Sequence, residues 1–193
     1  MVNRMHRRAR RGWTVIGVVI LLLLVALVAG IILANIDFER YRMDENARAL
    51  KNQFIAQQLT AVKLNVPVIV AFVYDRGKLT ITRDANSNGI ADAGEHSYTW
   101  ALMDGARFVT PPVTIGGAAP YYATGPGLTY LNQSYHYPTV TFYPNGSASG
   151  DVVVYIGSAA GRLADLRALQ ITGASSKVKF YRFAAGAWEL AEM

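Results

Sequence analysis

Apolar and polar positions divide the chain into an uncharged run, an amphipathic stretch and an alternating remainder. The run over residues 13–36 is 24 residues long and contains no charged side chain. A helix of that length extends for about 36 Å, which is enough to cross the roughly 30 Å hydrocarbon core of a bilayer. The pattern therefore predicts a transmembrane helix over 13–36.

Residues 37–66 have the spacing of a second helical stretch, which Pro67 prevents from continuing. Apolar side chains recur there at intervals of three and four residues: Leu50, Phe54, Ile55, Leu59, Ala61, Val62 and Leu64. Charged side chains are expected on the solvent side: Asp37, Arg40, Asp44, Arg48, Lys51 and Lys63. We expect one unbroken helix from about Trp13 to Asn65, whose outer part packs its apolar stripe on the rest of the chain.

The remaining residues have the alternation and the turn signals of β structure. Strands are predicted at 68–74, 78–83, 97–102, 139–143, 152–156, 168–172 and 177–183. A long N-terminal helix against an antiparallel sheet is an α+β arrangement. The predicted organisation is a leader at 1–12, the transmembrane helix at 13–36, its extramembrane part at 37–66 and a β-rich head at 67–193.

Charge is distributed unevenly along the 193 residues, whose formal net charge is +6. Five arginines lie in the leader: Arg4, Arg7, Arg8, Arg10 and Arg11. Beyond Ile36, fourteen cations face thirteen acids, which leaves a net charge of only +1. The excess positive charge therefore lies in the leader and is no evidence for nucleic-acid binding. The leader arginines predict a cytoplasmic N-terminus with the head outside.

The junction between the leader and the apolar run is compatible with three kinds of N-terminus. An ordinary signal peptidase would cut after the apolar stretch, near Ala29 or Ala34. An uncleaved anchor would keep the whole leader. The order of basic cluster, Gly12, Trp13 and Thr14 resembles the leader of a type IV prepilin. That resemblance implies cleavage by a prepilin peptidase between Gly12 and Trp13, N-methylation of the new terminus and retention of the helix.

Four further segments resemble the GspH/FimT family of minor pseudopilins and minor type IV pilins. They are residues 46–67, 84–95, 141–150 and 169–182, in the order typical of that family. The resemblance implies a structural subunit of a type II secretion pseudopilus or a type IV pilus. It also implies partner pilins that pack through the N-terminal helix, and a place in the inner membrane or in a filament in the periplasm or at the cell surface. Gly17 stands where the family usually has Glu, which favours a specialised minor subunit.

Residues 84–95 fit the pattern of a calcium-binding loop. The expected oxygen ligands are Asp84, Asn86, Asn88, the Ile90 carbonyl, Asp92 through water, and Glu95. Strands rather than helices flank the loop, and only three carboxylates are present. The alternative is a polar hairpin loop in which Asn, Asp and Gly supply turn geometry.

Lys177, Lys179 and Arg182 form a basic group near the C-terminus. In a DNA-uptake pilin such a surface would contact phosphates, and its affinity would fall with salt. The alternative is a solvated strand face that discourages edge pairing. These two hypotheses define the second functional class for this chain, a membrane-anchored extracytoplasmic binding module for DNA or calcium.

The sequence gives no support to an enzymatic role. It contains no cysteine, so thiolate catalysis and Cys-based zinc sites are excluded. It contains no phosphate-binding glycine loop, no nucleophile elbow and no His pair at metal-ligand spacing. We therefore expect a structural protein rather than an enzyme.

Overall fold

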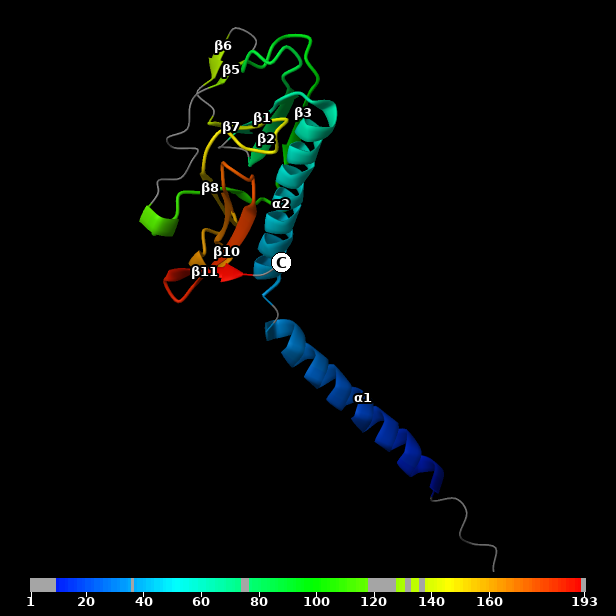
Figure 1. Cartoon of the computed structure of the whole chain (residues 1–193). Helices are drawn as coiled ribbons and strands as arrows, with labels where there is room; N and C mark the ends of the chain where they lie inside the picture. The colour runs from blue at the N-terminus through cyan, green and yellow to red at the C-terminus, as the bar shows by residue number, and fades with distance from the viewer. Residues whose placement is uncertain are drawn as a thin grey trace, which may run out of the picture. The chain divides into compact units, whose positions relative to one another are not determined.

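The computed structural model describes residues 10–35, 37–73, 77–117, 128–130, 133–135 and 138–191. The chain divides into two compact units, the first reaching Phe38 and the second beginning at Glu39. The first unit contains helix α1 (Arg10–Asn35). The second contains nearly all of helix α2 (Phe38–Leu64) and the strands, and is called the head below (Figure 1).

Helix α1 is rich in Leu, Val and Ile, and its described side chains, those of residues 15–30, are exposed all around the helix. Within the residues that the structure describes, no helical stretch combines the length and the apolar character that crossing a bilayer requires. The transmembrane helix over 13–36 stays a prediction.

The predicted single helix from Trp13 to Asn65 is two helices in the structure. Helix α1 ends at Asn35, α2 begins at Phe38, and Asp37 belongs to neither. Asn and Asp side chains compete for backbone hydrogen bonds, which makes them poor in helix interiors and favourable at helix starts. Helix α2 ends where expected, because Asn65 takes a left-handed conformation (φ 56°) just before Pro67.

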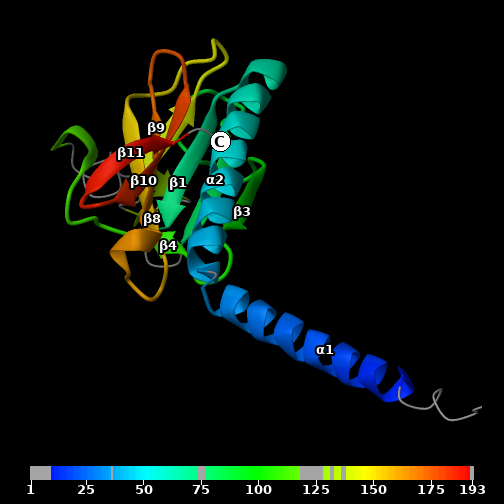
Figure 2. The ribbon, with the colours of Figure 1, turned by 90° about the horizontal axis from the view of Figure 1, so that it is seen from below.

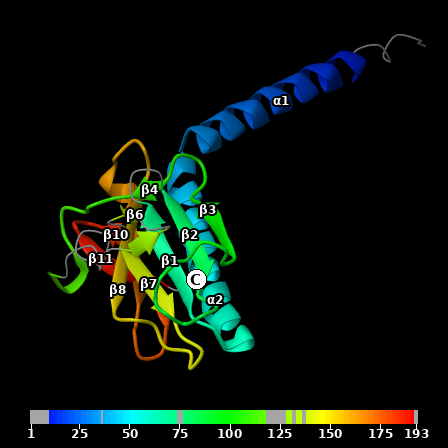
Figure 3. The same ribbon diagram turned by 90° about the horizontal axis from the view of Figure 1, so that it is seen from above.

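The described part of the head combines α2 with two larger antiparallel sheets and one two-stranded sheet, which confirms the expected α+β class. The described strands are β1 (Val68–Val73), β2 (Lys78–Arg83), β3 (Ser97–Ala101), β4 (Arg107–Phe108), β5 (Leu128–Tyr130), β6 (Gln133–Tyr135), β7 (Thr139–Phe142), β8 (Val152–Gly157), β9 (Arg167–Ile171), β10 (Val178–Ala184) and β11 (Ala187–Ala191). Short 3-10 helices occur at η2 (Ile115–Gly117) and η3 (Leu163–Asp165). One sheet has the order β3-β2-β1-β7 and can be followed in Figure 3, the second has the order β11-β10-β9-β8-β4, and β5 pairs with β6.

Each of the seven predicted strands is present, and within the described chain each end lies at most one residue from its predicted position. The structure adds β4, β5, β6 and β11, which the sequence pattern did not predict. In β2, Leu79 and Ile81 are buried in the largest apolar cluster while Thr80 between them is only partly buried, and Thr82 is buried on the sheet's other face.

The largest of three apolar clusters among the described residues lies between α2 and the two larger sheets. Figure 2 shows α2 crossing in front of β1, with β3 on one side and β8 to β11 on the other. The helix contributes residues at spacings of three, four and seven: Met43, Ala47, Leu50, Phe54 and Ala61. The Phe54 ring lies 6.2 Å from that of Phe72 and 6.3 Å from that of Phe142, so one helical side chain touches two strands of the first sheet. Burial of each such ring stabilises the head by roughly 1.5–3 kcal/mol.

Candidate functional site

Helix α1 exposes a continuous apolar surface. Twelve large apolar side chains are each at least half exposed: Val15, Ile16, Val18, Val19, Ile20, Leu21, Leu22, Leu23, Leu24, Val25, Leu27 and Val28. Scattered apolar residues are normal on a protein surface, but a contiguous apolar surface marks an interaction site. Lipid or other apolar helices are the surroundings that such a helix favours.

The predicted processing residues belong to this helix. The backbones of Gly12 and Trp13 lie in the first turn of α1, and their side-chain surroundings are outside the described residues. Apart from the neighbouring residues and backbone of α1 itself, no described atom lies within 4 Å of the place that a Cβ on Gly17 would occupy. Packing within this chain therefore does not require glycine at that position.

Helix α2 has an apolar outer face as well as its buried one. The predicted stripe splits in two: Leu50, Phe54 and Ala61 point into the core, whereas Leu59 is 62% exposed. The outer face comprises Ile55, Leu59 and Val62. These residues lie four and three positions apart, so they form one surface over the last three turns of α2. We call this surface the α2 outer face.

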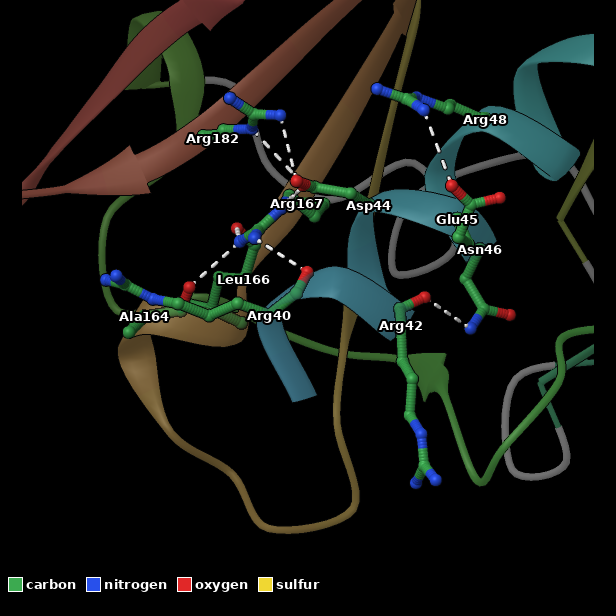
Figure 4. Close-up of polar contacts among 10 residues, drawn as sticks. All are labelled: Arg40, Arg42, Asp44, Glu45, Asn46, Arg48, Ala164, Leu166, Arg167 and Arg182. Atoms are coloured by element: carbon green, nitrogen blue, oxygen red, sulfur yellow. Dashed lines mark hydrogen bonds and ion pairs between the residues drawn. The ribbon is translucent and has the colours of Figure 1, made fainter. Parts of the chain in front are cut away.

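The buried face of α2 is joined to the second sheet by a cluster of charges around Asp44 (Figure 4). Arg167 on β9 donates its Nε–H to Asp44, and Arg182 on β10 donates Nη2–H to Asp44 Oδ2 over 2.8 Å. The Arg167 side chain is only 4% exposed and also donates to the carbonyls of Ala164, Leu166 and Arg40. The prediction of Asp44 on the solvent side is therefore wrong, since the carboxylate is mostly buried against two arginines.

Neutral polar side chains of α2 form a second set of contacts with the head. Gln53 and Gln57 each donate to the Tyr98 hydroxyl of β3 over 3.0 Å, and Gln58 donates to the Gly146 carbonyl over 3.0 Å. Buried Asn46 accepts a 2.7 Å hydrogen bond from the Met103 backbone. Sequence reasoning missed these contacts and the Asp44 cluster, because their partners lie 41 residues or more away.

Within the loop over residues 84–95, backbone and side-chain N–H groups of the loop itself donate hydrogen bonds to its carboxylates. Buried Asp84 accepts from the backbone N–H of Asn88 over 3.0 Å and from that of Gly89 over 2.8 Å. Both Glu95 oxygens accept backbone N–H bonds, from Ala85 over 2.8 Å and from Asp92 over 3.1 Å. This arrangement gives each carboxylate a structural role in the turn.

Asp92 receives two side-chain amide hydrogen bonds, from Asn86 over 2.9 Å and from Asn88 over 2.6 Å. These bonds lower the pKa of Asp92, because they favour its charged form. Ile90, the predicted carbonyl ligand, donates its own N–H to Asn88 Oδ1 over 2.8 Å. Across the described residues, no three His, Asp or Glu side chains are grouped so as to hold a metal ion. Calcium binding stays a prediction.

The structure does not bring the three predicted phosphate-binding residues together. Lys177 and Lys179 are exposed and lie two positions apart. Arg182 lies over the Phe180 ring at 5.5 Å and is paired with Asp44, so its guanidinium belongs to the junction with α2. Residues 179 and 182 have opposite parity along β10, so their side chains leave the strand on opposite faces.

Comparison with known proteins gives one similarity. No protein-family model matches the chain, and no curated protein matches it. Among solved structures it is similar to the minor pseudopilin EpsH from the type 2 secretion system of Vibrio cholerae, with 11% sequence identity and a TM-score of 0.45. The match covers 78% of this chain and 96% of that chain. Similarity at this level establishes neither family membership nor function.

Proposed function

We propose that this chain is a structural subunit of a pilin-like filament, of the minor pseudopilin or minor pilin kind. Helix α1 is the assembly element, and the head follows it in the chain. The observation that carries the proposal is the apolar surface of α1, where twelve large side chains between Val15 and Val28 are at least half exposed. In a filament, packing against the helices of neighbouring subunits would keep this surface out of water, where its exposure would cost about 25 cal/mol for each Å².

Before assembly, the same helix serves as the membrane anchor. This part of the proposal rests on the uncharged sequence over 13–36, which extends beyond the side chains described in α1, and on the five leader arginines that keep the N-terminus inside. Prepilin peptidase cuts after Gly12 and leaves Trp13 as the first residue. Cleavage on the cytoplasmic side preserves the helix, whereas an ordinary signal peptidase would remove most of it.

The α2 outer face is the contact of the head with a neighbouring subunit. It contains Ile55, Leu59 and Val62 on successive turns, and these residues are 36%, 62% and 49% exposed. Because the opposite face of α2 is fixed to both sheets, the outer face is held rigidly in place for a partner. Rigid apolar side chains bind at a small cost in conformational entropy.

Single-cysteine cross-linking tests this assignment, since the natural chain has no cysteine. In cells that contain the filament machinery, Leu59→Cys is expected to form adducts with neighbouring filament subunits. Ala160→Cys is the matched control, because it is also exposed but lies on the loop after β8. The proposal would be contradicted if Leu59→Cys gave no adducts. It would also be contradicted if Ala160→Cys gave adducts in the same yield as Leu59→Cys.

A substitution gives the complementary result. Leu59→Asp is expected to remove the protein from the sheared filament fraction while leaving the head folded, because position 59 is outside the core. Ala160→Asp introduces the same charge away from α2 and should assemble normally. Normal assembly of Leu59→Asp would exclude the α2 outer face from the filament interface. An anchored binding module that never enters a filament would show no effect of either substitution.

A further inference from the structure

One end of the head carries a surface cavity of about 380 Å³ whose walls are mainly apolar. Its lining comes from the start of α2, the loop before η2, the η3 segment and the β10–β11 turn: Arg40, Pro112, Val113, Leu163, Ala164, Phe183, Ala184, Ala185 and Gly186. Leu163 is 54% exposed and Val113 is 48% exposed. Figure 1 shows the β10–β11 hairpin and the N-terminal turns of α2 at the same end of the head.

The chemistry around this cavity is that of a membrane interface. Arg40 contributes an exposed side chain to the lining, and the next residue along α2, Tyr41, lies outside the lining and is 65% exposed. Arginine and tyrosine are favoured at the level of lipid headgroups, where the apolar part of the side chain faces the acyl chains and the polar end meets phosphate and water. Leu163 and Val113 add the apolar contacts that such a surface needs.

Chain connectivity limits the distance between Arg40 in this cavity and the end of α1. Only five residue steps separate Asn35, the last residue of α1, from Arg40 in the cavity wall. Even a fully extended chain of that length spans no more than about 18 Å. If α1 is anchored as proposed above, Arg40 therefore stays within about 18 Å of the end of that helix. A lipid surface held so close has a high effective concentration, so weak contacts suffice for docking.

We propose that this end of the head docks on the phospholipid surface while the subunit waits in the membrane. Leu163 and Val113 insert among the headgroups, and the Arg40 guanidinium binds lipid phosphate. The proposal rests on the membrane anchoring included in the proposed function. Docking would orient the α2 outer face in the membrane-bound pool, and withdrawal from the lipid would accompany extraction into a filament.

Fluorescence quenching in the full chain tests the docking. Leu163→Cys and Ala174→Cys are each labelled with bimane in liposomes of phosphatidylethanolamine and phosphatidylglycerol. Ala174 is the matched control, because it is exposed on the turn between β9 and β10, at the other end of β10 from the cavity. We expect brominated lipid to quench the label at position 163 several-fold more strongly than the label at 174. Iodide in the water should show the reverse order.

Three other outcomes overturn the docking, and they separate it from the anchoring. If the protein leaves the membrane in alkaline carbonate, anchoring and docking both fail. If it remains in the membrane and position 163 is as open to iodide as position 174, docking alone fails. If position 163 is shielded from iodide without being quenched by brominated lipid, protein covers the cavity and the lipid assignment is wrong. Circular dichroism of both labelled variants checks that the head stays folded.

Discussion

At the scale of single residues, charge pairs decide how α2 is held against the second sheet. Asp44 accepts hydrogen bonds from Arg167 and Arg182, and Arg167 is almost completely buried. The sequence shows Asp44 as one more charged residue in a helix, with nothing to indicate partners 123 and 138 residues later. Long-range pairing of this kind has no local signal, which explains why position 44 was wrongly predicted to face solvent.

Removal of the Asp44 carboxylate should destabilise the head strongly. We expect Asp44→Ala to lower the free energy of unfolding by about 3–5 kcal/mol, because it leaves buried Arg167 without its counter-ion. Glu45→Ala is the control on the same helix, since Glu45 pairs with Arg48 at the surface and its loss should cost at most about 1 kcal/mol. Urea unfolding of both variants measures the difference. Equal, small losses would mean that the cluster does not anchor α2.

Asp84 should stabilise its loop without any cation. It is buried and accepts two backbone hydrogen bonds, so Asp84→Ala is expected to cost about 2–3 kcal/mol. The loss should be the same in excess EDTA and in millimolar calcium. A loss that appears only with calcium, together with heat of calcium binding in calorimetry, would instead identify residues 84–95 as the calcium loop that the sequence pattern predicts.

At the scale of elements, the sequence predicts strongly patterned segments well and short or alanine-rich ones poorly. The strand β2 agrees with the predicted bounds because its alternation is clear. The strand β11 has no β-branched residue and follows a turn in which Ala185 (φ 49°) and Gly186 (φ 84°) are both left-handed. Two such residues make the turn favoured in two-residue hairpins, but its usual signals are Asn-Gly and Asp-Gly. Pairing with β10 therefore defines β11, whereas local propensity does not.

The β10–β11 turn offers a stabilising substitution. Ala185 adopts a conformation that costs an L-residue roughly 1 kcal/mol, and Asn tolerates it better. We expect Ala185→Asn to raise the free energy of unfolding by about 0.5–1 kcal/mol, measured by urea unfolding. The control is Ala160→Asn, which changes an exposed loop residue in the same way. A neutral or destabilising result at position 185 alone would contradict the turn geometry.

The loop before η2 is joined to the second sheet through Tyr155 of β8. The Tyr155 ring is buried, lies 5.2 Å from the Trp188 ring, and its hydroxyl accepts the Ile115 N–H over 2.7 Å. Trp188 in turn donates its indole N–H to the Val113 carbonyl over 2.6 Å. Burial raises the pKa of Tyr155, and the Ile115 hydrogen bond opposes this to a smaller extent.

Stability should therefore decline at alkaline pH. Above about pH 10, the unfolded chain releases the Tyr155 proton while the folded chain retains it, so the free energy of unfolding falls as pH rises. Tyr155→Phe should weaken this alkaline decline, although it also removes the acceptor for Ile115. Thermal unfolding from pH 8 to 11 compares the two proteins. Parallel curves would show that Tyr155 titrates as it does in the unfolded chain.

At the scale of the whole molecule, hydrophobic periodicity predicts the fold class but not which surfaces are buried within the chain. The α+β class follows from periodicity that the sequence displays, whereas the division of the strands into separate sheets does not, because it depends on pairing between distant strands. The division of the apolar stripe on α2 into a buried face and an exposed one does not follow either, because periodicity alone cannot tell packing within a chain from packing between chains. The three candidate phosphate-binding residues do not share one surface for a related reason: Arg182 pairs with Asp44 of α2, a partner that the sequence pattern does not indicate.

The measurement that tests the account most directly is the intact mass of the protein isolated from membranes of cells that contain prepilin peptidase. We predict a chain that starts at Trp13, methylated at its new terminus, and we predict that Gly12→Ala abolishes the cleavage. A chain that begins near Gly30 or Asn35 would show ordinary secretion and loss of the assembly helix. An intact chain that still begins at Met1 would contradict processing and leave an unprocessed membrane anchor in place of a filament subunit.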